Sequence, residues 1–180
     1  MRAIVESIEA EFRRYKKLAE GALAQLTDSE LDATPSSADN SVAVIVQHVG
    51  GNLRSRFTDF LTSDGEKPWR DREREFEPRG AGRDELMTLW EGGWTALAGA
   101  LAGLDDGRLG RQVVIRGQPL TVIEALHRAL AHVAYHVGQI VFVAKGLRGA
   151  DWSYLSIPPG RSDDYNRNPT RERPPRRPAT

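Results

Sequence analysis

The sequence contains no cysteine among its 180 residues. The absence of cysteine excludes disulfide scaffolds, cysteine-ligated zinc sites, iron–sulfur clusters and a cysteine nucleophile. If the protein binds a metal ion such as zinc, its ligands would therefore have to be histidines. If it carries out thiol chemistry, the sulfur would have to come from the substrate.

Long apolar runs and an excess of charge of one sign are also lacking. No apolar stretch reaches the length of about 18 residues that a membrane-spanning helix needs, so we expect no membrane association. Glutamates at positions 6, 9 and 11 interrupt any secretory signal near the start, so we expect a cytoplasmic protein. Lys and Arg together number 25 and Asp and Glu together number 25, which argues against a globally basic nucleic-acid binder.

Apolar residues recur every three to four positions in four segments, the pattern of helices with one buried face. A chain of this length can bury a hydrophobic core large enough to fold without a disulfide bond or a structural metal ion. We therefore predict an all-α protein, with a four-helix bundle domain over residues 1–160. The predicted helices cover about residues 2–26, 41–62, 84–104 and 122–146.

The connections between these helices differ in length and composition. Residues 63–83 are rich in charge, Pro and Gly, and this length favours a crossover along the molecule between the second and third helices. Within it, we interpret the run GEKPWRDREREF as a solvated loop because its opposite charges balance. Residues 112–120 predict a small β-hairpin before the fourth helix. Thr121 and Glu124 form a capping box at the start of that helix, and Gly146 and Gly149 are expected to end it.

The C-terminal segment, residues 161–180, is polar and rich in Arg and Pro, and we expect it to be disordered. From Arg167 onward it holds five arginines and one glutamate. A basic tail can contact nucleic acid, but no nucleic-acid-binding module accompanies it. We therefore interpret it as a solubilising tail and expect no nucleic-acid partner.

The candidate chemistry lies in the four histidines, three of them on the predicted fourth helix. His132 and His136 are four residues apart, about 40° around a helix, so both imidazoles can reach one metal ion. His127 lies about 140° from His132 and points elsewhere. The third ligand would have to be His48 on the second helix. Three imidazoles leave coordination positions open, as in catalytic sites, and imidazole ligands favour Zn²⁺ or Ni²⁺. The alternative is that these are ordinary histidines, because the spacing also arises by chance.

Other side chains near this candidate site have two interpretations each. Gln139 and Asn52 could orient a ligand histidine or contact a substrate, or could be polar residues without such a role. Trp90 and Trp94 could line a substrate pocket, but packing in the core is the preferred interpretation.

Several long segments resemble the DinB/YfiT-like superfamily of metalloenzymes, and more narrowly a branch of it known only as a domain of unknown function. The segments are QHVGGNLRSRFTDFLTSDGEKPWRDREREFEPR, VVIRGQPLTVIEAL, AHVAYHVGQIVFVAK and WSYLSIPPGRSDDYN. The resemblance implies a four-helix bundle that holds a divalent metal ion through His48, His132 and His136. It also implies homodimers, as in many members.

Better-known relatives in that superfamily use low-molecular-weight thiols to transfer bacillithiol, mycothiol or glutathione, or to isomerise maleylpyruvate. The resemblance therefore implies a metal-dependent enzyme, for instance an S-transferase. Its partners would be a small thiol and an electrophile. Arg54, Arg56 or Arg70 could then bind carboxylates of the thiol. The alternative is a non-catalytic metal-binding or stress-response module.

Overall fold

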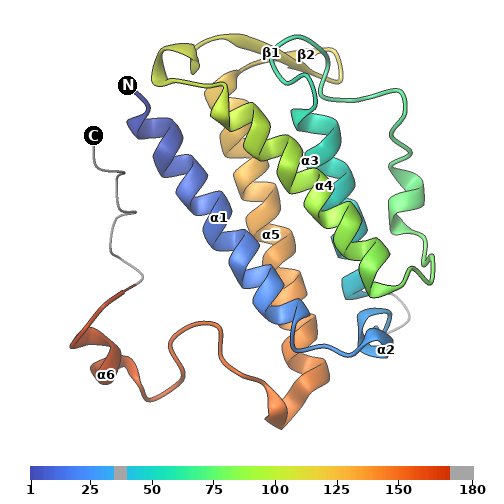
Figure 1. The fold of residues 1–180 in the computed structure, drawn as a ribbon, viewed down its shortest axis with the longest axis vertical. Coiled ribbons are helices and arrows are strands. Elements are labelled where there is room, and N and C mark those ends of the chain that lie inside the picture. Colours follow the sequence, from blue (N-terminus) through green and yellow to red (C-terminus); the bar gives the residue numbers. More distant parts are fainter. Residues whose placement is uncertain (35–39, 171–180) are drawn as a thin grey trace.

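The computed structural model describes residues 1–34 and 40–170, and four long helices lie side by side in it (Figure 1). Two strands form an antiparallel hairpin in which Val113 pairs with Leu120. The prediction of a mostly helical protein with a small hairpin is confirmed. The four long helices are α1 (Ala3–Leu23), α3 (Val42–Phe57), α4 (Arg83–Ala102) and α5 (Val122–Arg148).

Short elements connect the long helices or follow them. They are α2 (Asp28–Leu31), the 3-10 helices η1 (Glu73–Phe76), η2 (Asp106–Arg108) and η3 (Gly149–Asp151), the strands β1 (Gln112–Ile115) and β2 (Gln118–Thr121), and α6 (Ser162–Asn166). None of the helices in the described ranges combines the length and the apolar character needed to cross a membrane.

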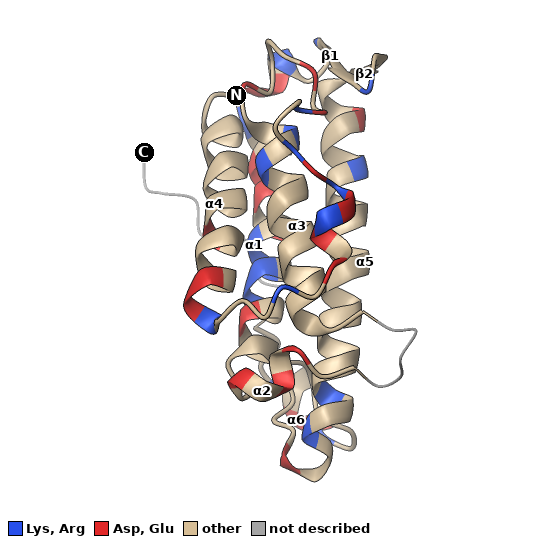
Figure 2. Cartoon of the chain, turned by 90° about the vertical axis from the view of Figure 1, so that its right-hand side faces the viewer, with Lys and Arg blue, Asp and Glu red and all other residues tan. Residues whose placement is uncertain are grey.

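The connection between α3 and α4 decides how the helices are arranged. α3 and α4 run in the same direction, whereas α1 and α5 run in the opposite one (Figure 1). The chain between α3 and α4 must therefore return along the whole molecule, and it does so on the outside, as the predicted crossover does. Charged residues of both signs lie along this crossover (Figure 2). Its 3-10 helix η1 packs against α3.

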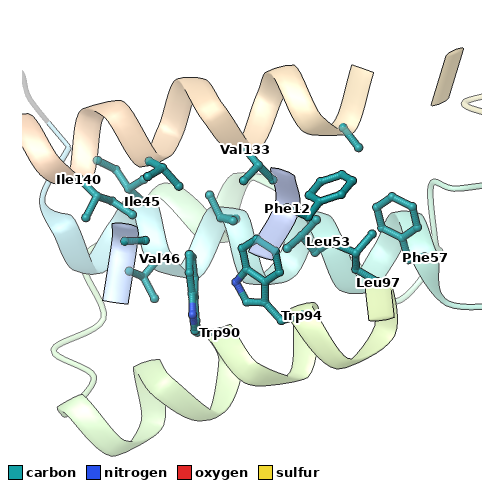
Figure 3. Close-up of a cluster of buried hydrophobic side chains, with 14 of the residues drawn as sticks. Phe12, Ile45, Val46, Leu53, Phe57, Trp90, Trp94, Leu97, Val133 and Ile140 are labelled. Carbon is teal, nitrogen blue, oxygen red and sulfur yellow. The ribbon is translucent and has the colours of Figure 1, made fainter. Parts of the chain in front are cut away.

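The core between the helices is formed by aliphatic and aromatic side chains (Figure 3). Trp90 is fully buried, and its ring lies edge-on to Trp94 at 5.3 Å between centroids. Trp94 in turn meets Phe12 of α1 edge-on at 6.4 Å. The two tryptophans thus belong to the core, in agreement with the preferred interpretation.

Two glycines allow α3 and α4 to approach closely. A Cβ atom on Gly93 would lie 2.5 Å from the carbonyl oxygen of Gly50, and one on Gly50 would lie 2.7 Å from the carbonyl oxygen of Leu89. Both distances are shorter than real Cβ contacts, so any side chain here would push the helices apart. The neighbouring Gly92 has open space around its Cα.

Helix α5 begins where the capping box predicts. The backbone N–H of Thr121 donates to Glu124 Oε2 at 2.7 Å, and the N–H of Glu124 donates to Thr121 Oγ1 at 3.3 Å. These bonds satisfy N–H groups that have no partner within the helix. From this start, α5 continues unbroken through His132 and His136.

Three details of the predicted elements are wrong. The second helix ends at Phe57 rather than near residue 62, because Thr58 is extended and Asp59 has a positive φ of 50°. Gly146 lies inside α5. The helix continues to Arg148 and ends before Gly149, whose φ is 52°. The tail predicted to be disordered contains a short helix, α6, at its beginning. The rest of that prediction, from residue 171 onward, lies outside the described residues.

Candidate metal centre

The structure brings His48, His132 and His136 together, although 84 residues separate the first two. His48 lies in the middle of α3 and is buried, whereas the other two are half-buried, one turn apart on α5. One ring nitrogen from each histidine lies within 4.8 Å of the other two. In the described part of the chain, this group could hold a metal ion.

One pair of nitrogens lies at a distance close to that of two ligands of one metal ion. Nε2 of His48 lies 3.1 Å from Nε2 of His132. Two nitrogens at about 2.0–2.1 Å from a tetrahedral zinc ion are about 3.3 Å apart. The ring of His136 completes the group, with its centroid 4.8 Å from that of His48 and 4.5 Å from that of His132. Coordination of one ion by all three rings requires the nitrogens, which now lie within 4.8 Å of one another, to close to about this distance.

The orientation of His48 is set by a carboxylate. Its Nδ1 lies 2.9 Å from Oε2 of Glu75, in η1. A carboxylate only accepts hydrogen bonds, so Nδ1 donates and Nε2 is the nitrogen left to bind a metal ion. Glu75 is fixed in turn by Arg70, whose Nε and Nη2 donate to its two oxygens at 2.8 and 2.7 Å. Carboxylates placed in this way are common behind metal-binding histidines.

Burial of Glu75 would by itself raise the pKa of its carboxyl group. The hydrogen bonds and charges of Arg70 and His48 outweigh that effect, and the pKa lies below its usual value. Glu75 is therefore a carboxylate at neutral pH and accepts the hydrogen bond that His48 donates. The ring of Phe76, next along η1, covers His48 at 4.6 Å between centroids.

A side-chain amide orients His136. Nδ1 of His136 lies 2.7 Å from Oε1 of Gln139, and the amide nitrogen of Gln139 donates to the hydroxyl of Tyr135 at 3.2 Å. Nδ1 therefore donates and Nε2 is free to bind a metal ion. The structure thus places Gln139 in the orienting position that the sequence suggested, while Asn52 lines a cavity beside the histidines.

His132 has no such partner. Its Nδ1 is buried and has no hydrogen bond to the described residues. Burial, followed by the positive charges that His136 and His48 would carry, lowers the pKa of His132 to about 3. Burial also lowers the pKa of His136, against the hydrogen bond that its Nδ1 donates to Gln139, which raises it. Both rings are therefore neutral at pH 7, as metal binding requires.

A cavity of about 220 Å³ lies beside the histidines. His48 and His132 form part of its wall, so a small molecule in this cavity would lie next to the candidate metal position. His127 takes no part in the site and is exposed on α5, as its angle on the helix predicts.

Comparison with known proteins shows the family of this chain. A family model, described as a protein of unknown function (DUF1572), matches residues 1–161. The chain belongs to the DUF1572 family. No curated protein matches it. The DUF1572 description gives no function, so the geometry of the site carries the functional argument.

In this DUF1572 protein the role of Glu75 could not be found from the sequence. Glu75 is one of several acidic residues in the run that we interpreted as a solvated loop. That interpretation is wrong for part of the run, because the side chain of Arg70 is only 2% exposed and Lys67 is buried. The only signal was the density of charge itself, which does not distinguish a buried carboxylate from a solvated one.

Proposed function

We propose that this protein is a metal-binding protein in a DinB/YfiT-like four-helix bundle, with one divalent ion, Zn²⁺ or Ni²⁺, bound by His48, His132 and His136. The observation that carries the proposal is the convergence of three imidazoles whose nitrogens lie within 4.8 Å of one another. Two of the three rings are already oriented through Nδ1, by Glu75 and by Gln139. This orientation leaves Nε2 as the metal-binding atom on both rings.

We further propose that the site is catalytic. Three protein ligands leave positions open for water or a substrate, and the cavity reaches His48 and His132. A divalent ion in such a site lowers the pKa of a bound water or thiol towards neutrality. Because the chain has no cysteine, a thiol would have to be a small external molecule. The reaction class proposed is transfer of that thiol, or of water, to an electrophile.

Metal analysis of the protein purified without a histidine tag tests the binding site. We expect about one divalent ion per chain in the wild type and a loss of metal in His136→Ala. His127→Ala is the matched control, because it removes an exposed histidine from the same helix. Equal metal content in all three proteins would overturn the proposed site.

Turnover assays separate an enzyme from the non-catalytic alternative. With a low-molecular-weight thiol and a chromogenic electrophile, the metal-loaded wild type should turn over and His136→Ala should not. A structural role would instead appear as a large drop in melting temperature on chelation without any turnover. The homodimer implied by the DinB resemblance and the cytoplasmic location stay predictions, and light scattering of the purified chain tests the dimer.

A further inference from the structure

The cavity beside the histidines is surrounded by positive charge. Among the described residues, its wall includes Arg56, Arg70, Arg72, Arg116 and Arg128, and no aspartate or glutamate. The arginines come from α3, the crossover, the hairpin and α5, which are distant in the sequence. The fold therefore gathers guanidinium groups around one small space.

The carboxylates that form ion pairs with these arginines are fewer than the arginines. Glu66 pairs with both Arg56 and Arg116, at 3.0 and 2.7 Å. Glu75 pairs with Arg70, and the exposed Glu73 pairs with Arg72. The arginines thus exceed their carboxylate partners by two. Arg128 has no ion pair among the described residues, and its side chain is exposed to solvent at the cavity wall.

One of the arginines has a hydrogen-bond donor that no described residue satisfies. The side chain of Arg70 is 98% buried, and its Nε and Nη2 are bound to Glu75. Its Nη1, on the other end of the guanidinium, is buried and has no partner in residues 1–34 and 40–170. An unpaired buried charged donor is costly, and Arg70 lines the cavity, so an acceptor on a ligand that reached Nη1 from the cavity would be stabilising.

Besides the arginines, His48, His132 and Asn52, the wall is apolar, and the space is small. Phe57 and Phe60 line it with their rings 5.0 Å apart, and Ala125 and Ala129 of α5 lie in the same wall. The volume of about 220 Å³ is below the range of about 300–1,000 Å³ that drug-sized ligands occupy. The cavity therefore suits a molecule with a short apolar part and one charged end.

We propose that this cavity binds a small organic carboxylate, with the carboxylate at Arg70 Nη1 and Arg128 and the carbon chain against Phe57 and Phe60. Guanidinium groups match the two oxygens of a carboxylate, and such charge-assisted bonds are stronger than neutral ones. The inference names the substrate class of the proposed function. It rests on that function only for the position of the substrate beside the metal ion.

Titration of the metal-free protein with butyrate and with its neutral isostere butyramide, followed by NMR chemical shifts, tests this inference. We expect butyrate to bind at least roughly tenfold more tightly than butyramide. Arg70→Lys keeps the charge but removes Nη1, and should abolish most of this preference. Arg128→Gln should weaken butyrate binding by about three- to fivefold without affecting the fold, because its side chain is exposed.

Arg111→Gln is the matched control, because Arg111 is exposed, does not line the cavity and has no ion pair in the described part of the chain. Equal binding of butyrate and butyramide would overturn the inference, as would equal effects of Arg128→Gln and Arg111→Gln. Tighter binding of inorganic phosphate than of butyrate would overturn the carboxylate class. If metal analysis finds no metal in the wild type but butyrate still binds to it, the proposed function fails and this inference is supported.

Discussion

Glu75 and His48 are joined by a hydrogen bond of 2.9 Å between Oε2 and Nδ1, although they lie 27 residues apart on different elements. The bond links the crossover to the histidine on α3. It sets which nitrogen of His48 faces the other two rings. The crossover is thus part of the candidate metal centre as well as a connection between helices.

Glu75→Gln should weaken zinc binding by about 10- to 100-fold, because removal of a carboxylate behind a histidine ligand loosens the ring and lowers its basicity. The measurement is competition with a chromophoric chelator. Glu73→Gln is the control, since Glu73 lies on the same 3-10 helix but its side chain is 83% exposed. Similar affinities for Glu75→Gln and Glu73→Gln would show that the hydrogen bond does not support the site.

Gly51→Ala should weaken zinc binding without removing any ligand or charge. A Cβ atom at position 51 would clash with the carboxylate of Glu75 and push it away from His48. The control is Gly138→Ala on α5, where an added Cβ meets nothing within 4 Å. Zinc affinity should fall for Gly51→Ala only, and unchanged affinity in that variant would mean that Glu75 can shift without cost to the site.

Gly93→Ala and Gly92→Ala should change stability in opposite directions, although they are neighbours in α4. The added methyl at position 93 would press on the backbone of Gly50, and overpacking of this kind costs about 1–3 kcal/mol. At position 92 the methyl meets nothing, and replacing glycine by alanine in a helix stabilises by about 0.5–1 kcal/mol. Urea unfolding measures both, and changes of the same sign would contradict the close approach of α3 and α4.

The metal-free protein should lose stability as the pH falls below about 6.5. Burial lowers the pKa of His132 to about 3 in the folded state, while its ordinary value is 6.5. Between these values the unfolded chain binds a proton that the folded chain does not, so unfolding becomes more favourable as the pH drops. Above about 6.5 the ring is neutral in both states, and this contribution to stability is fully present.

Urea unfolding of the metal-free wild type and of His132→Asn between pH 7.5 and pH 4 checks this. The stability of the variant should fall less steeply with decreasing pH, since the carboxylates titrate in both proteins and only the histidine differs. Parallel curves would show that His132 is protonated at its ordinary pKa in the folded protein.

The sequence by itself determined the features that depend on neighbours along the chain. The spacing of apolar residues predicted the four long helices, and Thr121 and Glu124 marked where α5 begins. The same helical geometry put His132 and His136 on one face and His127 on another. These predictions succeeded because the contacts lie within about one helical turn, so they leave a regular pattern in the sequence.

The tertiary structure alone decided the features that depend on distant segments. It placed the carboxylate of Glu75 behind His48, and it distinguished Gly93, at the contact with α3, from Gly92, which faces open space. It also gathered the arginines of separate elements around one cavity. Such contacts depend on the path of the chain and on the packing of α3 against α4 and α5, and no periodicity in the sequence records them.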